Sequence, residues 1–537
     1  MGTREDRNEK DDVAMALHAV VIPLPAQGHI APAILLAKKL VGLGFRITFV
    51  NTTPNHEQMM KSRSKAMEPE KGIEFVSISD GLPDDHPRER KWTEFSNAIL
   101  AMGPAFEEFF VNLLRMSPIS CVIRDIRFTA VQASATKLGI PVVGIAACPA
   151  IALQCALKVP TLLSMGILPL PPPPPNSTPS LHPVAMTLGL PRSEEEAAAR
   201  QAPLTGVVTG ASPTMRVEHM PTHFLTHELV SHWNHNPLLL DCDCLLFNPF
   251  HDLEGAVLDA MAEELKLHVL GVGPLSLNSS TTEDGVEEVA IAGAGSFLRE
   301  EDPVALSWLD GRSPKSVLFV SFGSEATPSM EQAEEFAHGL EMSGHAFLWV
   351  IRSDTIDGMC EASKDFGVMF SEFLKQTQNR GLLVSWAPQT AVLSHPSVGT
   401  FLTHCDWNST IESIASGVPM LGWPRYADHT TDCHYITQVW RIGLALESRE
   451  SPVDRSMVVP REEVDRKVRK MMANEDETDA EVADIQTNSR KYELASRKAV
   501  VQGGSSHSAL TKLVKLVESW RTKQEHPFPP SRIECGA

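Results

Sequence analysis

Continuous apolar runs alternate with amphipathic segments along this chain, and this alternation predicts parallel strands joined by helices. Residues 18–24 (HAVVIPL) form one such run, followed by a glycine-containing turn and a helical pattern that stops at Gly44. The next run is 45–50 (FRITFV), and the same rhythm recurs over 121–145. A strand covered by helices on both faces is apolar throughout, so these segments predict a doubly wound parallel α/β sheet.

The rhythm restarts in the second half of the chain. Residues 317–321 (VLFVS) and 346–351 (AFLWVI) are apolar runs, with the helical pattern 330–342 between them. A segment rich in Ser, Thr and Gly at 277–295 marks the joint. We therefore expect two Rossmann-like doubly wound domains that face each other across a cleft.

The expected domain boundaries follow the changes in composition. The predicted segments are a disordered N-terminus (1–17), an N-terminal domain (18–274) with a Pro-rich variable insertion at about 165–215, an interdomain linker (275–303), a C-terminal domain (304–504), a C-terminal helix (505–522) and a disordered tail (523–537). Five consecutive prolines at 171–175 favour an extended polyproline II segment. That segment fits a surface insertion, a loop beside the substrate or a docking site for a proline-binding module.

Size and charge narrow the possible functions. A chain of 537 residues is too long for a single core, and its hydrophobic fraction of 43% is that of a globular protein. The 47 Lys and Arg residues against 67 Asp and Glu give a net charge of −20, which argues against nucleic acid and anionic membranes as partners. A small anionic ligand can still bind locally, at a helix N-terminus.

Cysteine usage indicates a reduced compartment. The chain has nine scattered cysteines, which is typical of a cytoplasmic protein rather than of a disulfide framework. Cys242 and Cys244 form a lone CxC, which indicates buried thiols rather than a zinc site. The charged N-terminus is unlike a secretory leader, and the longest apolar run, 142–157, is short for a membrane span. We expect a cytoplasmic protein without an integral membrane segment.

The segment 386–429 carries most of the chemistry. Within it, 400–403 is predicted to be a buried strand, followed by a turn and a helix that runs towards Gly417. Asn408 or Ser409 falls in the first turn of that helix. Free N–H groups and the positive end of the helix dipole lie there, so the position suits a diphosphate.

Further polar side chains near this helix start extend the predicted site. His404 and the Ser409 hydroxyl would reinforce the diphosphate contacts. Glu412 lies three residues beyond Ser409 on a neighbouring part of the helix surface, where it could accept hydrogen bonds from ribose hydroxyls. Taken singly, each residue is as readily a helix cap or a solvated side chain. Together they predict a site for a nucleotide diphosphate.

Several motifs in this region stand at the spacing of a known signature. They are WAPQ, HPSVGTFLTHC, WNS, a Glu, GVP, WP and AD. The chain closely resembles the plant-type family 1 UDP-glycosyltransferases, the secondary-product glycosyltransferases. The blocks PLPAQGHIAPAILLAKKL, CVIRD, VLFVSFGS and GGSS extend the resemblance over most of the chain. It implies the GT-B fold, with the acceptor bound by the N-terminal domain and the UDP-sugar by the C-terminal domain.

The resemblance also implies roles for individual residues. Trp386 would stack on uracil and the backbone at Ala387 would pair with its edge. The ribose would be held by Gln389 and Glu412, the diphosphate by His404, Asn408, Ser409 and Ser324, and the sugar by Trp407, Asp428 and His429.

Transfer to a hydroxyl requires a general base that removes the acceptor's proton. His29 follows the first predicted strand and Asp125 ends a later one, so both should reach the carboxyl edge of the sheet. There the carboxylate would orient the imidazole and stabilise its charged form, and the family's catalytic His and Asp match these positions. Taken alone, His29 is as readily a loop residue that caps a helix. A single displacement would invert the anomeric centre and yield a β-glycoside from an α-linked donor.

No cofactor is expected, because the UDP-sugar is a co-substrate. The one DxD pattern, Asp241 to Asp243, precedes a predicted strand of the first domain, away from the predicted diphosphate site. We therefore expect no metal ion.

Asp406 departs from the signature, because relatives usually carry Gly at this position. If its carboxylate lay about 8 Å from the diphosphate at an effective dielectric near 20, repulsion would cost roughly 2 kcal/mol. That energy would weaken donor binding about thirtyfold. Alternatively, Asp406 caps the helix with its side chain turned away from the ligand.

His429 is a second departure, because glucosyl-transferring relatives usually carry Gln there. The His resembles some galactosyl-transferring members, so we expect UDP-glucose first and UDP-galactose second. Trp407, rather than an Arg, argues against a glucuronate donor. Asp432 replaces a usual Asn.

The resulting hypothesis is an inverting UDP-sugar-dependent hexosyltransferase. It would transfer glucose or galactose to a hydroxyl of a small, largely apolar acceptor such as a phenolic or a terpenoid. The alternative, motivated by Asp406, is a catalytically weak nucleotide-sugar-binding protein with a regulatory role. A dinucleotide-dependent oxidoreductase is disfavoured, because no GxGxxG follows the first predicted strand.

Overall fold

The computed structural model describes most of the chain. The described ranges are 16–63, 71–88, 91–170, 191, 193–225, 240–281, 287–291, 304–323, 326–351, 364–451, 457–474 and 479–525. The proline run at 171–175, Ser324, and most of the two segments predicted to be disordered lie outside the described residues.

The first sheet has seven parallel strands in the order β3-β2-β1-β4-β5-β6-β7. Its strands are β1 (Leu17–Ile22), β2 (Phe45–Thr52), β3 (Ile73–Ile78), β4 (Cys121–Asp125), β5 (Val142–Ala146), β6 (Cys244–Phe247) and β7 (His268–Gly271). The helices of this half are α2 (Gln27–Gly42), α3 (Thr53–Arg63), α4 (Trp92–Ala101), α5 (Gly103–Met116), α6 (Thr129–Lys137), α7 (Ala150–Ser164), α8 (Glu194–Arg200) and α10 (His251–Leu265), with the short turns η1 (Val217–His219) and η2 (Thr222–Phe224).

Strand β1 shows why its sequence is apolar throughout. Ala19 and Val21 pack with α2 on one face of the sheet, whereas Val20 and Ile22 pack with α4 and α5 on the other. Successive side chains of a strand point to opposite faces, so a strand between two helical layers needs apolar residues at every position. The prediction of a doubly wound sheet is confirmed in this half.

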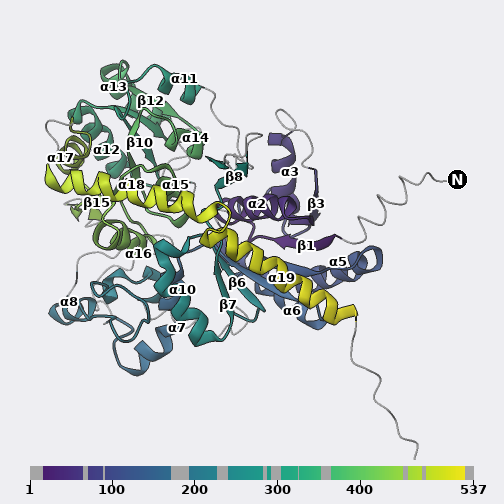
Figure 1. The fold of residues 1–537 in the computed structure, drawn as a ribbon. Helices are drawn as coiled ribbons and strands as arrows, with labels where there is room; N and C mark the ends of the chain where they lie inside the picture. Colours follow the sequence, from purple (N-terminus) through teal and green to yellow (C-terminus); the bar gives the residue numbers. More distant parts are fainter. Residues whose placement is uncertain are drawn as a thin grey trace, which may run out of the picture.

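The second sheet has six parallel strands in the order β12-β11-β10-β13-β14-β15 (Figure 1). These are β10 (Val317–Ser321), β11 (Ala346–Val350), β12 (Gly381–Val384), β13 (Val398–Thr403), β14 (Met420–Gly422) and β15 (Gly443–Ala445). The helices are α11 (Val304–Asp310), α12 (Met330–Ser343), α13 (Lys364–Thr377), α14 (Gln389–Leu393), α15 (Trp407–Ser416), α16 (His429–His434), η5 (Tyr435–Val439), α17 (Arg461–Met471), α18 (Ala480–Val500) and α19 (Ser505–Glu525), and a small ribbon joins β16 (Arg449–Glu450) to β17 (Met457–Val458). Two doubly wound halves were predicted, and two are present.

Part of the segment expected to be the interdomain linker, 275–303, forms regular structure within the described residues. Strands β8 (Leu277–Thr281) and β9 (Glu287–Ile291) form an antiparallel ribbon. Leu277 is fully buried against Ala415 and Val500 of the second half. The Thr residues that helped to mark the joint are also compatible with a strand, because β-branched residues are enriched in strands.

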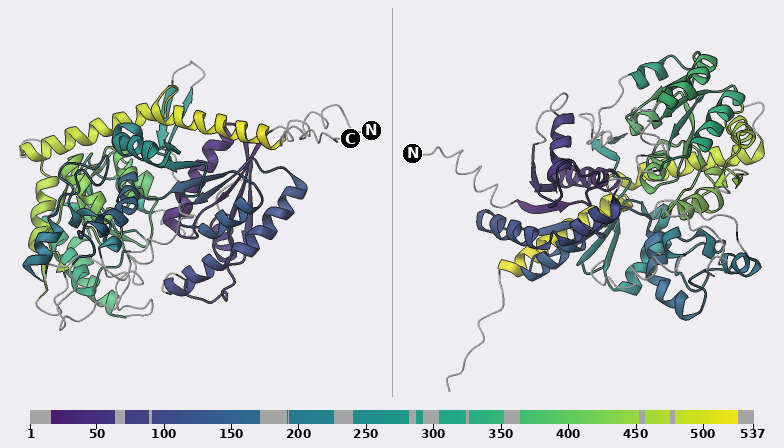
Figure 2. Two further views of the ribbon diagram at one scale, coloured as in Figure 1. Left: turned by 90° about the horizontal axis from the view of Figure 1, so that it is seen from below. Right: turned by 180° about the vertical axis from the view of Figure 1, so that it is seen from behind.

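The last two helices tie the halves together. Helix α18 contacts α15 and α10, and α19 then returns to the first half, where Leu513 and Val517 are buried in its core. The break between them is at Gly503, whose φ of +80° suits glycine. Figure 2 shows the two helices following one another, with a bend between them, across both halves. Two ends differ from the predicted boundaries: β1 begins at Leu17, and α19 extends to Glu525 rather than ending at 522.

None of the helices in the described ranges combines the length and the apolar character needed to cross a bilayer.

A buried carboxylate holds the start of α7. Glu254 of α10 is 2% exposed and accepts hydrogen bonds from the backbone N–H groups of Ala150 (3.0 Å) and Ile151 (3.1 Å). Burial raises the pKa of this carboxyl to about 7, although the two hydrogen bonds act in the opposite direction. The charged form is therefore less favourable in the folded protein than in the unfolded chain.

We predict that Glu254→Gln removes a pH-dependent loss of stability. The folded pKa exceeds the unfolded value, so the wild type loses stability as the pH rises from about 5 to 8, by up to about 3 kcal/mol. The measurement is the free energy of unfolding of wild type and variant at both pH values, with Glu263→Gln on the exposed side of α10 as the control. Parallel pH dependence in wild type and Glu254→Gln would contradict the prediction.

Candidate active site

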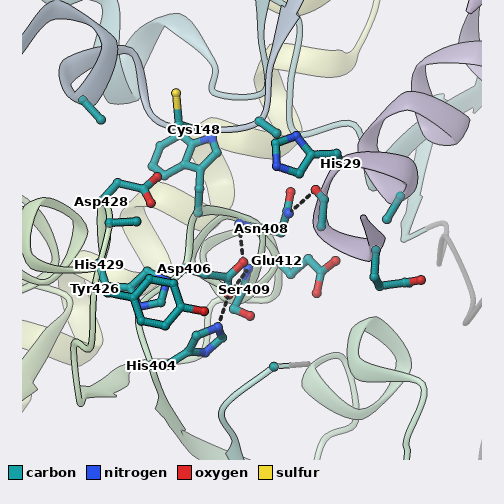
Figure 3. A pocket seen from close by; sticks show the side chains of 18 of the residues that line it. His29, Cys148, His404, Asp406, Asn408, Ser409, Glu412, Tyr426, Asp428 and His429 are labelled. Atoms are coloured by element: carbon teal, nitrogen blue, oxygen red, sulfur yellow. Dashed lines mark hydrogen bonds and ion pairs between the residues drawn. The ribbon is translucent and has the colours of Figure 1, made fainter. Parts of the chain in front are cut away.

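The carboxyl ends of the two parallel sheets border one cavity of about 310 Å³. Its first wall comes from the start of α2 and from the β4–α6 and β5–α7 loops, and its second from the loops after β12, β13 and β14. Figure 3 shows side chains from both walls pointing towards a common space. Ligands of doubly wound sheets bind at this edge, where helix N-termini converge.

His29 and Asp125 meet in the first wall. His29 lies in the first turn of α2, and its Nδ1 is 2.5 Å from Oδ2 of Asp125, the last residue of β4. Strands β1 and β4 are direct neighbours, which brings the residues that follow them together. Because the carboxylate accepts a hydrogen bond from Nδ1, Nε2 is the nitrogen that can take a proton from a ligand.

Asp125 is held in its charged form. The residue is 2% exposed, and burial alone would raise its pKa. The charge and hydrogen bond of His29, together with a 2.8 Å hydrogen bond from the backbone N–H of Arg127, outweigh burial and lower the pKa of Asp125. A charged carboxylate beside the imidazole stabilises the imidazolium that forms when Nε2 accepts a proton.

A hydrogen-bonded group of polar side chains forms part of the second wall. Gln389, the first residue of α14, donates from Nε2 to Oγ of Ser409 (3.0 Å) and to Oε2 of Glu412 (2.9 Å). Burial raises the pKa of Glu412 to about 7, the Gln389 hydrogen bond opposes this, and the charge of Asp406 adds to it. Trp386 and Ala387, just before Gln389, also line the cavity.

Asp406 caps helix α15 from inside the cavity. Its carboxylate accepts hydrogen bonds from the backbone N–H groups of Asn408 (3.2 Å) and Ser409 (3.3 Å), and Nε2 of His404 lies 3.2 Å from the same group. The predicted helix cap is therefore present. The side chain is not turned away, however, because Asp406 lines the cavity beside the residues predicted to hold a diphosphate.

Asn408 connects the two walls. Its side-chain amide donates a 2.7 Å hydrogen bond to the carbonyl of Gly28, the residue before His29 (Figure 3). Sequence reasoning gave Asn408 only a diphosphate contact. The bond to Gly28 depends on the relative position of two sheets, which the sequence does not contain.

The remaining predicted residues lie deeper in the second wall. His404 and His429 are buried with their rings edge to face at 4.9 Å, and burial lowers the pKa of both. Trp407 is 1% exposed and lines the cavity. Asp428 also faces the cavity, and burial raises its pKa to about 6, partly offset by the charge of Arg127. The structure thus gathers every described residue of the predicted site around one cavity.

A largely apolar wall was not assigned to particular residues from the sequence. It includes Cys148, Leu153 and Ala156 from the region of α7, and Phe224 from η2. The α7 residues belong to a buried apolar helix, a pattern that by itself indicates only a core.

Backbone contacts fix the position of η2. The N–H of Thr222 donates to the carbonyl of Ala427 (2.8 Å), and the hydroxyls of Thr430 and Thr431 donate to the carbonyls of Met220 and His219. The segment 219–222 of the first half is therefore docked on helix α16 of the second half and on Ala427 just before it.

The DxD pattern lies elsewhere. Asp243 accepts a 2.8 Å hydrogen bond from the backbone N–H of Val142, next to the start of β6, and neither acidic residue of the pattern lines the cavity. Across the described ranges, no group of three or more His, Cys, Asp or Glu side chains is arranged to hold a metal ion.

Comparison with known proteins agrees with this geometry. A family model described as UDP-glucoronosyl and UDP-glucosyl transferase matches residues 295–452. A 7-deoxyloganetin glucosyltransferase of Gardenia jasminoides is 32% identical over 515 residues, which is 94% of this chain and 98% of the relative. Linamarin synthase 1 of Manihot esculenta is 33% identical over 521 residues, 93% of this chain and 96% of the relative.

Solved structures show the same fold. A structure from Phytolacca americana, complexed with UDP-2fluoro-glucose and pterostilbene, has a TM-score of 0.69 and 25% identity, covering 94% of this chain and 100% of that one. A UDP-glucosyltransferase from Polygonum tinctorium capable of glucosylating indoxyl has a TM-score of 0.71 and 25% identity, covering 94% of this chain and 99% of that one.

Proposed function

This chain belongs to the UDP-glycosyltransferase family, and on that premise we propose that it transfers glucose from UDP-glucose to a hydroxyl of a small, largely apolar acceptor, with inversion at the anomeric carbon. The observation that carries the proposal is the His29–Asp125 pair, which shares one cavity with the polar group around the start of α15. A base and an anion-binding helix end are the two parts that such a transfer requires.

The donor would lie along the second wall. We assign the uracil to Trp386 and Ala387, and the ribose to Gln389 and Glu412, whose polar atoms already form one network. The diphosphate would bind at the N-terminus of α15 with His404, and the sugar would contact Trp407, Asp428 and His429. Ser324 lies outside the described residues, and its phosphate contact remains part of the proposal.

Nε2 of His29 would remove the acceptor's proton as the acceptor oxygen attacks the anomeric carbon. The bond to the diphosphate breaks in the same step and UDP leaves with the electron pair. Asp125 stabilises the imidazolium, and no enzyme side chain forms a covalent intermediate. A single in-line displacement inverts the configuration and gives a β-glycoside.

The acceptor would bind against the apolar wall formed by α7 and η2. Relatives named for glucosylation of 7-deoxyloganetin, and a neighbour complexed with pterostilbene, support a compact acceptor with a hydroxyl on an apolar frame. The alternative of a regulatory binder finds no support among these relatives. We also propose a cytoplasmic location, supported by the seven free cysteines of the described residues.

We predict that His29→Ala lowers transfer at least about a hundredfold, because the general base is lost, while UDP binding stays intact. The transfer rate is measured as the initial rate of UDP release in the presence of an acceptor. UDP binding is measured by calorimetric titration. His268→Ala on the exposed edge strand β7 is the control. Undiminished turnover by His29→Ala would overturn the assignment of the base.

Donor choice is tested by a screen that follows UDP release with UDP-glucose and UDP-galactose in parallel, over a panel of phenolic and terpenoid acceptors. We expect UDP-glucose to give the larger kcat/KM. A larger value with UDP-galactose would reassign the donor and would point to His429, which stands where a Gln is usual.

Chelation tests the proposal that no metal is required. We expect unchanged initial rates after dialysis against EDTA, because charge at the diphosphate would be compensated by hydrogen-bond donors and the helix dipole. A loss of activity that Mg²⁺ or Mn²⁺ restores would contradict this.

A further inference from the structure

We propose that the Asp406 carboxylate occupies the phosphate seat of the resting enzyme, so that it competes with the donor and favours release of the product UDP. The phosphate seat is defined as the backbone N–H groups of Asn408 and Ser409 together with Nε2 of His404. The proposal rests on the proposed function, because it gives a role to one residue of the same site.

The carboxylate already uses every donor of the seat. Its oxygens lie 3.2 Å and 3.3 Å from the two backbone nitrogens, and 3.2 Å from Nε2 of His404. A helix N-terminus binds a carboxylate and a phosphate through the same N–H groups. The first turn of α15 therefore cannot bind the diphosphate fully until Asp406 has moved.

Asp406 differs from an ordinary acidic cap of this chain. Asp479, the N-cap of α18, accepts a hydrogen bond of 2.9 Å from the N–H of Val482, pairs with Lys470 at 2.9 Å, and is half exposed outside the cavity. The bonds of Asp406 are at the long end of the usual range, which weakens each of them. Its side chain is 26% exposed and borders the cavity. Asp406 is therefore held in place by contacts that a stronger anion can replace.

The charge of Asp406 reaches both sides of the cavity. Burial is the main cause of the raised pKa of Glu412, on the proposed ribose side, and of Asp428, on the proposed sugar side. The charge of Asp406 is a further cause at both residues. Burial lowers the pKa of His404, so at neutral pH its ring donates a hydrogen bond without carrying a compensating positive charge. A displaced Asp406 would therefore remain a negative charge beside the bound diphosphate.

This repulsion acts more strongly on the product than on the donor. The terminal phosphate of UDP has a second ionisation with a pKa of about 6, so UDP carries about one more negative charge at pH 7.5 than UDP-glucose, in which the sugar esterifies that oxygen. Once the sugar has left, the extra charge is generated next to Asp406. The carboxylate then returns to the N–H groups as UDP departs.

The test compares wild type with Asp406→Asn, which keeps an acceptor oxygen and removes the charge, and with Asp406→Gly, which removes both. We expect the Kd of UDP to fall at least about tenfold in both variants, while the Kd of uridine stays within twofold because uridine has no phosphate. Asp479→Asn, a cap outside the cavity, should change neither constant. Product inhibition is the second readout: the Ki of UDP should fall by a larger factor than the KM of UDP-glucose.

A change of less than threefold in the Kd of UDP in both Asp406 variants would overturn the proposal and leave Asp406 as a helix cap, visible as a lower melting temperature of Asp406→Gly alone. If the Ki of UDP and the KM of UDP-glucose fell by the same factor, the proposal that Asp406 favours release of UDP would be overturned. Continued sugar transfer in either case would leave the proposed function standing. If neither wild type nor any variant bound UDP, the proposed function would fail as well.

Discussion

The alignment of two parallel sheets, with their carboxyl ends directed at one cavity, is the constraint on which the site depends. Each half supplies what the other lacks: the first brings an imidazole paired with a buried carboxylate, and the second brings the polarised start of a helix. The hydrogen bond from Asn408 to the carbonyl of Gly28 and the contacts of η1 with α16 cross between the halves at this point. The shape of the cavity is thus a property of the interface rather than of either sheet.

Environment, not residue type, decides which acids of the cavity carry charge. Asp125 is buried but receives hydrogen bonds from His29 and the Arg127 backbone, and its pKa is lowered. The pKa of Asp428 is instead raised to about 6, because the effect of burial outweighs that of the neighbouring charges. Asp432, behind it, is 1% exposed, and neither of its carboxyl oxygens has a hydrogen-bond partner among the described residues. Burial raises its pKa well above the usual value.

The sequence predicts local structure here better than it predicts the contacts between distant parts of the chain. Strands buried on both faces must be apolar at every position, which made β1, β4 and β10 recognisable, and the end of a strand fixed where His29 and Asp125 would stand. The return of α19 to the first half depends on Leu513 and Val517, which resemble the apolar face of any amphipathic helix. The position of Asp406 shows a similar limit. The choice between cap and repulsion was visible in the sequence, whereas a cap that also lines the cavity follows only from the geometry.

The path of the chain through the two halves has a mechanical consequence. The described chain starts in the first half, and α19 ends against it. The second half is therefore connected to the first at both of its ends. The two crossings lie side by side: the N–H of Gln502 donates to Glu287 of the ribbon at 2.7 Å, and the Ser506 hydroxyl donates to the carbonyl of Gly273. Two neighbouring chain connections define a hinge axis. A rotation of the second half about this line would change the width of the cavity while leaving each wall intact, so a ligand could enter without a rearrangement inside either half.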